Sequence, residues 1–105
     1  MSRTIGPPIT LLSTADADVD QNNASWVSLE GPDEVLFDLA IVGANTATLD
    51  FSHLKDGVVS SNNAFTANNS LLVTSPVGNV RVWSNNIAAN ESAVVTMIKI
   101  YHDNR

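Results

Sequence analysis

The chain has 105 residues and no cysteine, so it is long enough for one two-layer domain that needs no disulfide, thiolate-bound metal or cysteine nucleophile. Its formal net charge of -6 and its pI near 4.4 argue against binding to nucleic-acid phosphates. Charged residues make up only 15% of the chain, so Asn, Ser and Thr must cover much of its surface. Such a surface suits a protein that neighbouring proteins will cover. The alternative is that it keeps the protein soluble without many charges.

The chain opens with a segment that ends in Pro7-Pro8, which excludes helix and predicts an extended N-terminal arm over residues 1–8. Such an arm either frays or lies across a partner subunit. We expect no secretory signal, because no unbroken apolar run follows the arginine near the start. No segment has the ~20 apolar residues of a membrane span. The prediction is a soluble protein made in a reducing cytoplasm, with residues 9–105 as a single β-sandwich domain.

An acidic stretch follows the first predicted strand, which starts at Ile9. Asp16, Asp18 and Asp20 alternate along it and resemble the opening of a calcium loop, because hard cations prefer clustered oxygens. A loop of the EF-hand type would need Gly where Gln21 stands and Glu where Val27 stands. We therefore expect a solvated acidic loop and no metal site.

The most regular alternation lies in Glu34–Lys55, after a short strand over 25–30 and a turn at 31–33. Apolar residues occupy every second position in both halves of this stretch, which is typical of strands with one buried face. The residues between the halves, 43–46, tolerate the backbone angles of a short reversal. We predict a central β-hairpin that buries the following side chains: Val35, Phe37, Leu39, Ile41, Ala47, Leu49 and Phe51.

The second half of the chain alternates predicted turns with short strands. Asp56-Gly57 is a strong reversal signal. The Asn-rich stretch Ser60–Ser70 is predicted to be a loop that Phe65 anchors to the core. Strands are then expected over 71–74, 80–84 and 93–101. The last of these is apolar on both faces, which predicts one face toward the core and the other toward a partner.

No stretch is convincingly helical, and the strands are short and closely spaced. This pattern predicts an all-β fold, an antiparallel β-sandwich or jelly roll of about seven to eight short strands.

The residues that carry chemistry give no catalytic motif. His53 has the alternation phase of the core side chains and is expected to be half-buried, whereas His102 lies in a polar tail. Asp50 and His53 have a spacing that does not require them to meet. There is no Gly-x-Ser-x-Gly and no His-Glu-x-x-His. We expect neither an enzyme nor a cofactor.

Two tryptophans point away from the core by the phase of their strands. Exposed Trp26 and Trp83 would mark a surface for sugars or partner proteins, and the alternative is that both fill the rim of the sandwich. Arg81, beside Trp83, is expected to stack on a ring or to pair with an acidic group.

The order of these segments resembles small β-sandwich virion proteins of tailed bacteriophages. The likeness spans roughly residues 9–101, and it is carried by segments 26–29, 31–35, 47–51, 56–57, 80–82 and 92–96.

The resemblance implies a non-enzymatic virion structural protein, most plainly a capsid decoration (cement) protein that binds where capsomers meet. The implied partners are the major capsid protein and other copies of this chain, as a trimer, with neither nucleic acid nor membrane. The arm with Pro7 and Pro8 would lie along the shell, and the faces of Trp83 and Met97 would contact neighbours. The alternatives are a receptor- or glycan-binding module of a phage fibre or tail tip, with Trp26 and Trp83 stacked on sugars, and a tail or connector component.

Overall fold

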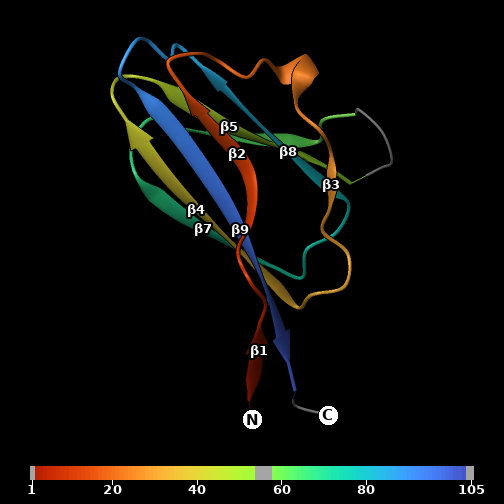
Figure 1. Ribbon diagram of the computed structural model, residues 1–105. Coiled ribbons are helices and arrows are strands. Elements are labelled where there is room, and N and C mark those ends of the chain that lie inside the picture. The colour runs from red at the N-terminus through yellow and green to blue at the C-terminus, as the bar shows by residue number, and fades with distance from the viewer. Residues whose placement is uncertain (1, 54–57, 104–105) are drawn as a thin grey trace.

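Two antiparallel sheets pack face to face in the computed structural model, which describes residues 2–53 and 58–103 (Figure 1). Sheet A has the order β1-β9-β4-β7, with β2 also on β9, and sheet B has the order β3-β8-β5-β6. The predicted all-β antiparallel sandwich is confirmed. The elements are β1 (Arg3–Ile5), β2 (Ile9–Ala15), the 3-10 helix η1 (Gln21–Asn23), β3 (Val27–Ser28), β4 (Glu34–Val42), β5 (Thr46–Ser52), β6 (Ser61–Phe65), β7 (Asn69–Thr74), β8 (Asn79–Asn85) and β9 (Ser92–His102).

The strand pairs are nested. β5 pairs with β6, β4 with β7, β3 with β8 and β2 with β9, all antiparallel. The strands are thus ordered as in one long hairpin, with β5 and β6 as its innermost pair, that is rolled into two layers, which is the jelly-roll arrangement. The predicted Asp56-Gly57 turn lies outside the described residues.

The predicted central hairpin is wrong. β4 and β5 do form, but β4 pairs with β9 and β7 in sheet A, whereas β5 pairs with β8 and β6 in sheet B. The connection crosses from one layer to the other at Gly43, which has φ +98, and at the buried Asn45, whose Nδ2 donates to the Val42 carbonyl at 2.9 Å. Apolar alternation does not distinguish a hairpin within one sheet from two strands in opposite sheets, because the strands have one apolar face in both arrangements.

The core lies between the layers and takes in most of the predicted side chains. Phe37 of β4 meets Phe51 of β5 edge to face, with ring centroids 5.8 Å apart. Phe65 packs against this core from β6, as expected. The buried hydrophobic residues of the core cluster are Leu12, Leu29, Val35, Phe37, Leu39, Ile41, Ala47, Leu49, Val80, Val82, Ile87, Ala93, Val95 and Met97.

Two further predictions need correction. The stretch Ser60–Ser70 is not one loop, since it contains β6 and the start of β7. β6 is an edge strand with mostly exposed side chains, so no apolar alternation reveals it. Met97 faces inward from β9 and is fully buried, so it is a core residue and not a surface contact. Both faces of β9 are apolar, and alternation alone does not say which one turns inward.

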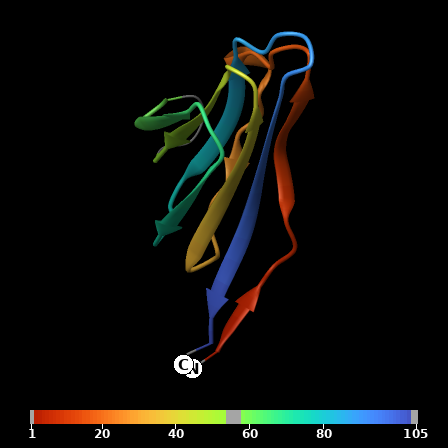
Figure 2. The ribbon, with the colours of Figure 1, turned by 90° about the vertical axis from the view of Figure 1, so that its left-hand side faces the viewer.

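The N-terminal arm is extended, and part of it forms a strand. β1 pairs with the end of β9, from Arg3 opposite His102 to Ile5 opposite Ile100. This two-stranded ribbon projects from one end of the molecule, where both termini lie (Figures 1 and 2). It contributes to an elongated shape of 49 × 27 × 17 Å. Among the described residues, no helix is long and apolar enough to cross a membrane.

Candidate functional site

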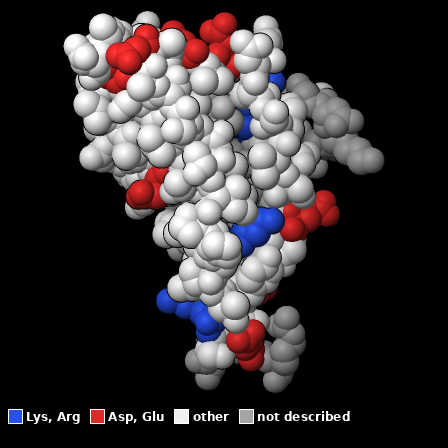
Figure 3. All heavy atoms as spheres, in the orientation of Figure 1, with Lys and Arg blue, Asp and Glu red and all other residues white. Residues whose placement is uncertain are grey.

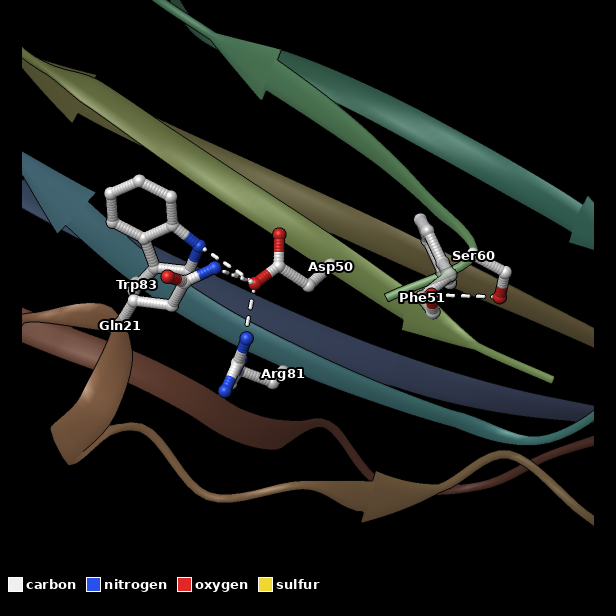
Figure 4. Close-up of polar contacts among 6 residues, drawn as sticks. All are labelled: Gln21, Asp50, Phe51, Ser60, Arg81 and Trp83. Atoms are coloured by element: carbon white, nitrogen blue, oxygen red, sulfur yellow. Dashed lines mark hydrogen bonds and ion pairs between the residues drawn. The ribbon is translucent and has the colours of Figure 1, made fainter. Parts of the chain in front are cut away.

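A buried carboxylate organises the outer face of sheet B. The Asp50 side chain is fully buried, and its Oδ2 accepts three hydrogen bonds: from Gln21 Nε2 at 2.8 Å, Arg81 Nε at 3.0 Å and Trp83 Nε1 at 3.0 Å (Figure 4). The Arg81 guanidinium also lies over the Trp26 ring, 4.4 Å from its centroid. We call these five residues the Asp50 cluster.

The cluster forms because this sheet face is covered. Asp50 lies directly opposite Arg81, and Thr48 opposite Trp83, on the neighbouring strands β5 and β8. Their side chains share the face that points away from the core. The segment between β2 and β3, which carries Gln21 and Trp26, lies across this face, so Thr48, Asp50 and Ser52 are buried.

A reciprocal pair of hydrogen bonds fastens the covering segment. The backbone N–H of Val19 donates to Ser84 Oγ at 2.8 Å, and the backbone N–H of Ser84 donates to the Val19 carbonyl at 2.9 Å. This bonding fixes the segment against β8, so the position of Gln21 above Asp50 is part of the fold.

The structure therefore brings three of the predicted contact residues together inside the molecule. Trp26, Arg81 and Trp83 are part-buried, and the stacked cation expected at Arg81 exists with Trp26 as its ring. One face of Trp26 is occupied by Arg81, and the indole N–H of Trp83 is bonded to Asp50. Sugar stacking on these rings thus has no supporting observation.

Sequence reasoning did not identify Asp50 and Gln21 as members of this cluster. The sequence did indicate that Arg81 and Trp83 share one face of their strand, because they alternate with the apolar Val80 and Val82. The missing information was the β5–β8 register, which decides that Asp50 lies opposite Arg81.

The acidic loop is more ordered than expected. Asp18 accepts the backbone N–H groups of Ile87 at 2.8 Å and Asn86 at 3.3 Å, and Asp16 accepts that of Asn90 at 2.6 Å. These carboxylates are exposed, as expected for a solvated loop, and they also fasten the β2–η1 loop to the β8–β9 loop. Acidic side chains gather at this end of the molecule, opposite the termini (Figure 3). In residues 2–53 and 58–103, no group of His, Asp and Glu is placed to hold a metal ion.

The histidines lie apart from each other and from the Asp50 cluster. His53 is exposed and not half-buried, because β5 ends at Ser52 and the alternation does not continue past the strand end. Asp50 is buried within β5, whereas the exposed His53 follows the end of that strand. His102 Nε2 lies 2.8 Å from Glu34 Oε1, so the tail is paired where it was expected to be solvated.

Sheet A presents apolar side chains on its outer face. The register places Leu72 of β7, Leu36 of β4 and Ile98 of β9 side by side across three strands. Leu72 is 51% exposed, and Leu36 and Ile98 are partly buried. We call these three residues the outer apolar row. Pro7 and Pro8 are exposed between β1 and β2.

A cleft of about 300 Å³ opens between β6 and β7 at the side of the sandwich. Its apolar lining includes Phe51, Leu71, Val73 and Val77, and exposed His53 lies at the same cleft. An apolar cleft with a few polar groups can accept an apolar side chain of a partner.

Comparisons with known proteins show no family for this chain. No protein-family model and no curated protein matches the sequence. A solved structure from work on Bacillus endospore appendages, described as a novel family of disulfide-linked pili, aligns with 96% of this chain and 90% of that chain. The two share 17% sequence identity, and the TM-score is 0.49.

Proposed function

We propose that this chain is a non-enzymatic structural protein that acts by binding other proteins on an assembled particle, and more specifically that it is a capsid decoration protein of a tailed bacteriophage. The observation that supports binding is the outer apolar row, which remains partly exposed on a paired sheet. Exposed apolar surface with polar surroundings is characteristic of protein interaction sites. The phage assignment rests on the resemblance of the sequence segments.

The surface around the row is suited to a protein partner. On the outer face of sheet A, β4 carries two carboxylates, Glu34 and Asp38, with Leu36 between them. Most other side chains on this face are small, polar or aliphatic. Interfaces typically combine an apolar centre with a polar rim. The projecting ribbon adds exposed Ile5 and Tyr101 at one end of this sheet. In this proposal the row contacts the shell, and the ribbon with Pro7 and Pro8 reaches a neighbouring subunit.

Cementing a shell is a physical task that such a surface can perform. A decoration protein contacts several capsid subunits at once, so each contact raises the effective concentration of the next. The combined binding opposes separation of the capsid subunits under internal pressure. No catalytic group is required for this activity.

The test is binding to expanded, undecorated heads of the phage whose genome carries the gene. We expect binding to be saturable and stoichiometric. A gel of intact particles should also show this chain in many copies. Ile98→Lys places a charge at the β9 end of the outer apolar row and should weaken head binding at least about tenfold, or about 1.4 kcal/mol. Val58→Lys, at a 56% exposed position outside the row, is the matched control. Absence of binding to heads, or equal binding by both variants, would contradict the proposal.

A further inference from the structure

One side of the sandwich ends in two open strand edges. Within the described residues, β7 pairs only with β4 and ends sheet A, and β6 pairs only with β5 and ends sheet B. Both strands lie on the side of the molecule opposite β2 (Figure 2). The cleft between them shows that the two edges adjoin.

The hydrogen bonds around β7 show which of its backbone groups face outward. The Ser75 N–H donates to the Asp33 carbonyl at 3.0 Å on the β4 side, whereas the Ser70 N–H is taken by the side chain of Asn69 at 2.8 Å. Because donors alternate along a strand, the N–H and C=O groups of Leu72 and Thr74 point away from β4. An edge with such groups is a template for another strand.

Charged side chains do not protect this edge. The sequence has no Lys, Arg, Asp or Glu from Val58 to Val80, a run that contains both β6 and β7. The opposite side differs, because β2 follows Pro7-Pro8 and has a register shift between Thr10 and Leu12, and β3 has two residues. Prolines, bulges and short strands are the devices that prevent edge pairing.

The same side also exposes apolar surface. Leu72 is 51% exposed and Val77 is 58% exposed. Leu71 and Val73 of β7 line the cleft between the edges. A strand added to β7 would therefore satisfy its backbone groups and cover apolar side chains in the same step.

We propose that this side binds a second copy of the chain, by antiparallel pairing of β7 with β7 of the other copy around a two-fold axis perpendicular to the sheets. Such an axis keeps the layers aligned, so sheet A continues across both copies and β6 faces its counterpart in sheet B. A strand is complementary to itself in antiparallel pairing. With a net charge of -6 per chain, this uncharged side lets two copies approach without opposed carboxylates.

The proposal differs from the trimer that the sequence resemblance implies, because an isologous contact closes at two copies. It does not depend on the proposed function, since self-association is measured without any particle. Light scattering after size exclusion should give twice the 11.2 kDa mass of the chain at high concentration. A monomer at every concentration, or a trimer, would overturn it.

A charge at the edge tests the surface. Leu72→Lys should weaken dimerisation at least about tenfold, or about 1.4 kcal/mol, because it places two ammonium groups near each other and removes apolar contact. Val42→Lys is the matched control, at a 57% exposed position at the end of β4, and should dimerise like the parent. Ser70→Lys repeats the test at an exposed edge position if Leu72→Lys fails to fold. Unchanged dimerisation in the folded edge variant would exclude β7.

Crosslinking gives an independent measurement, because the chain has no cysteine. Directly opposed residues in a hydrogen-bonded antiparallel pair have Cα atoms about 5.5 Å apart, which a disulfide can span. Ser70→Cys, Leu72→Cys and Thr74→Cys are oxidised in turn, with Val42→Cys as control. We expect one edge variant to form a crosslinked dimer much faster than the control. If none does, the β7–β7 pairing is wrong.

Discussion

Asp50 is the residue whose environment differs most from its local sequence. By alternation it belongs to the polar face of β5, yet its side chain is fully buried. Three donors meet its Oδ2, whereas no hydrogen-bond partner reaches Oδ1 within the described residues. A buried carboxylate of this kind is stable only while its partners remain, so the Asp50 cluster ties β5, β8 and the covering segment to one arrangement.

Asp50→Asn should destabilise the fold by about 3 kcal/mol, because it leaves the Arg81 guanidinium, whose side chain is 13% exposed, without its counter-charge. Urea unfolding at neutral pH measures this loss. Asp38→Asn, at an exposed carboxylate on β4, is the control and should change stability by less than about 0.5 kcal/mol. Equal effects in the two variants would show that the buried ion pair does not contribute.

Two of the glycines between strands both have a positive φ but lie in different surroundings. Gly78, between β7 and β8, has φ +76, and a Cβ there would overlap the carbonyl oxygen of Ser52. Gly31, in the turn before β4, has φ +114 and no atom within 4 Å of such a Cβ. The two positions separate backbone strain from steric overlap.

Gly31→Ala should cost about 1–2 kcal/mol, the strain of a left-handed backbone with a side chain. Gly78→Ala should cost clearly more, above about 3 kcal/mol, because the backbone of Ser52 must also move. Thermal or urea unfolding of both variants makes the comparison. If Gly78→Ala is no worse than Gly31→Ala, the close approach of β5 to this turn is wrong.

The loops at the acidic end are joined by Glu91. Its carboxylate accepts the backbone N–H groups of Ala88 and Ala44, each at 2.9 Å. The hydrogen bond from Ala88, followed by that from Ala44, lowers the pKa of Glu91 below its ordinary value of 4.5. A carboxylate with a lowered pKa stabilises the fold above its unfolded pKa, and that contribution is lost as the pH falls through the folded pKa.

Glu91→Gln should therefore have a lower melting temperature than the parent chain at pH 7, and the difference should shrink as the pH falls below 4.5. Melting curves at pH 7 and at successively lower pH measure the gap. Glu30→Gln, at an exposed position, provides the matched charge change. A gap that persists unchanged at acid pH would rule out this role for the ionised Glu91 carboxylate.

At the scale of the molecule, nested pairing makes most contacts long-range in sequence. β5 and β6 are the consecutive strands that pair directly, whereas β2 must find β9 across nearly the whole chain. Closing such long loops costs conformational entropy before the pairing energy is gained.

We therefore expect slow folding, on a timescale of milliseconds to seconds or longer, as for other folds with non-local strand pairing. Stopped-flow refolding followed by tryptophan fluorescence measures it, because Trp26 and Trp83 report formation of the Asp50 cluster. Folding in microseconds would contradict the nested topology.

How much the sequence reveals varies along the chain. Regular apolar alternation located β4, β5, β8 and β9, and it correctly selected most core side chains. It did not locate β6, whose side chains are mostly exposed. The surface role expected for the buried Met97 came from the family resemblance. The contact residues Trp26, Arg81 and Trp83 were recognised as lying off the core, and a stacked cation was expected at Arg81, but the shared contact with Asp50 was not predicted.

By itself, the sequence determined that the protein is all-β and which side chains of its regular strands share an apolar face, because the apolar alternation of a strand is a local property. The tertiary structure alone decided that β4 and β5 occupy different layers, that Asp50 is buried and that β6 and β7 are left as open edges. Those features depend on which strands pair and in what register, and hydrogen bonds between distant strands leave no mark in the local order of side chains.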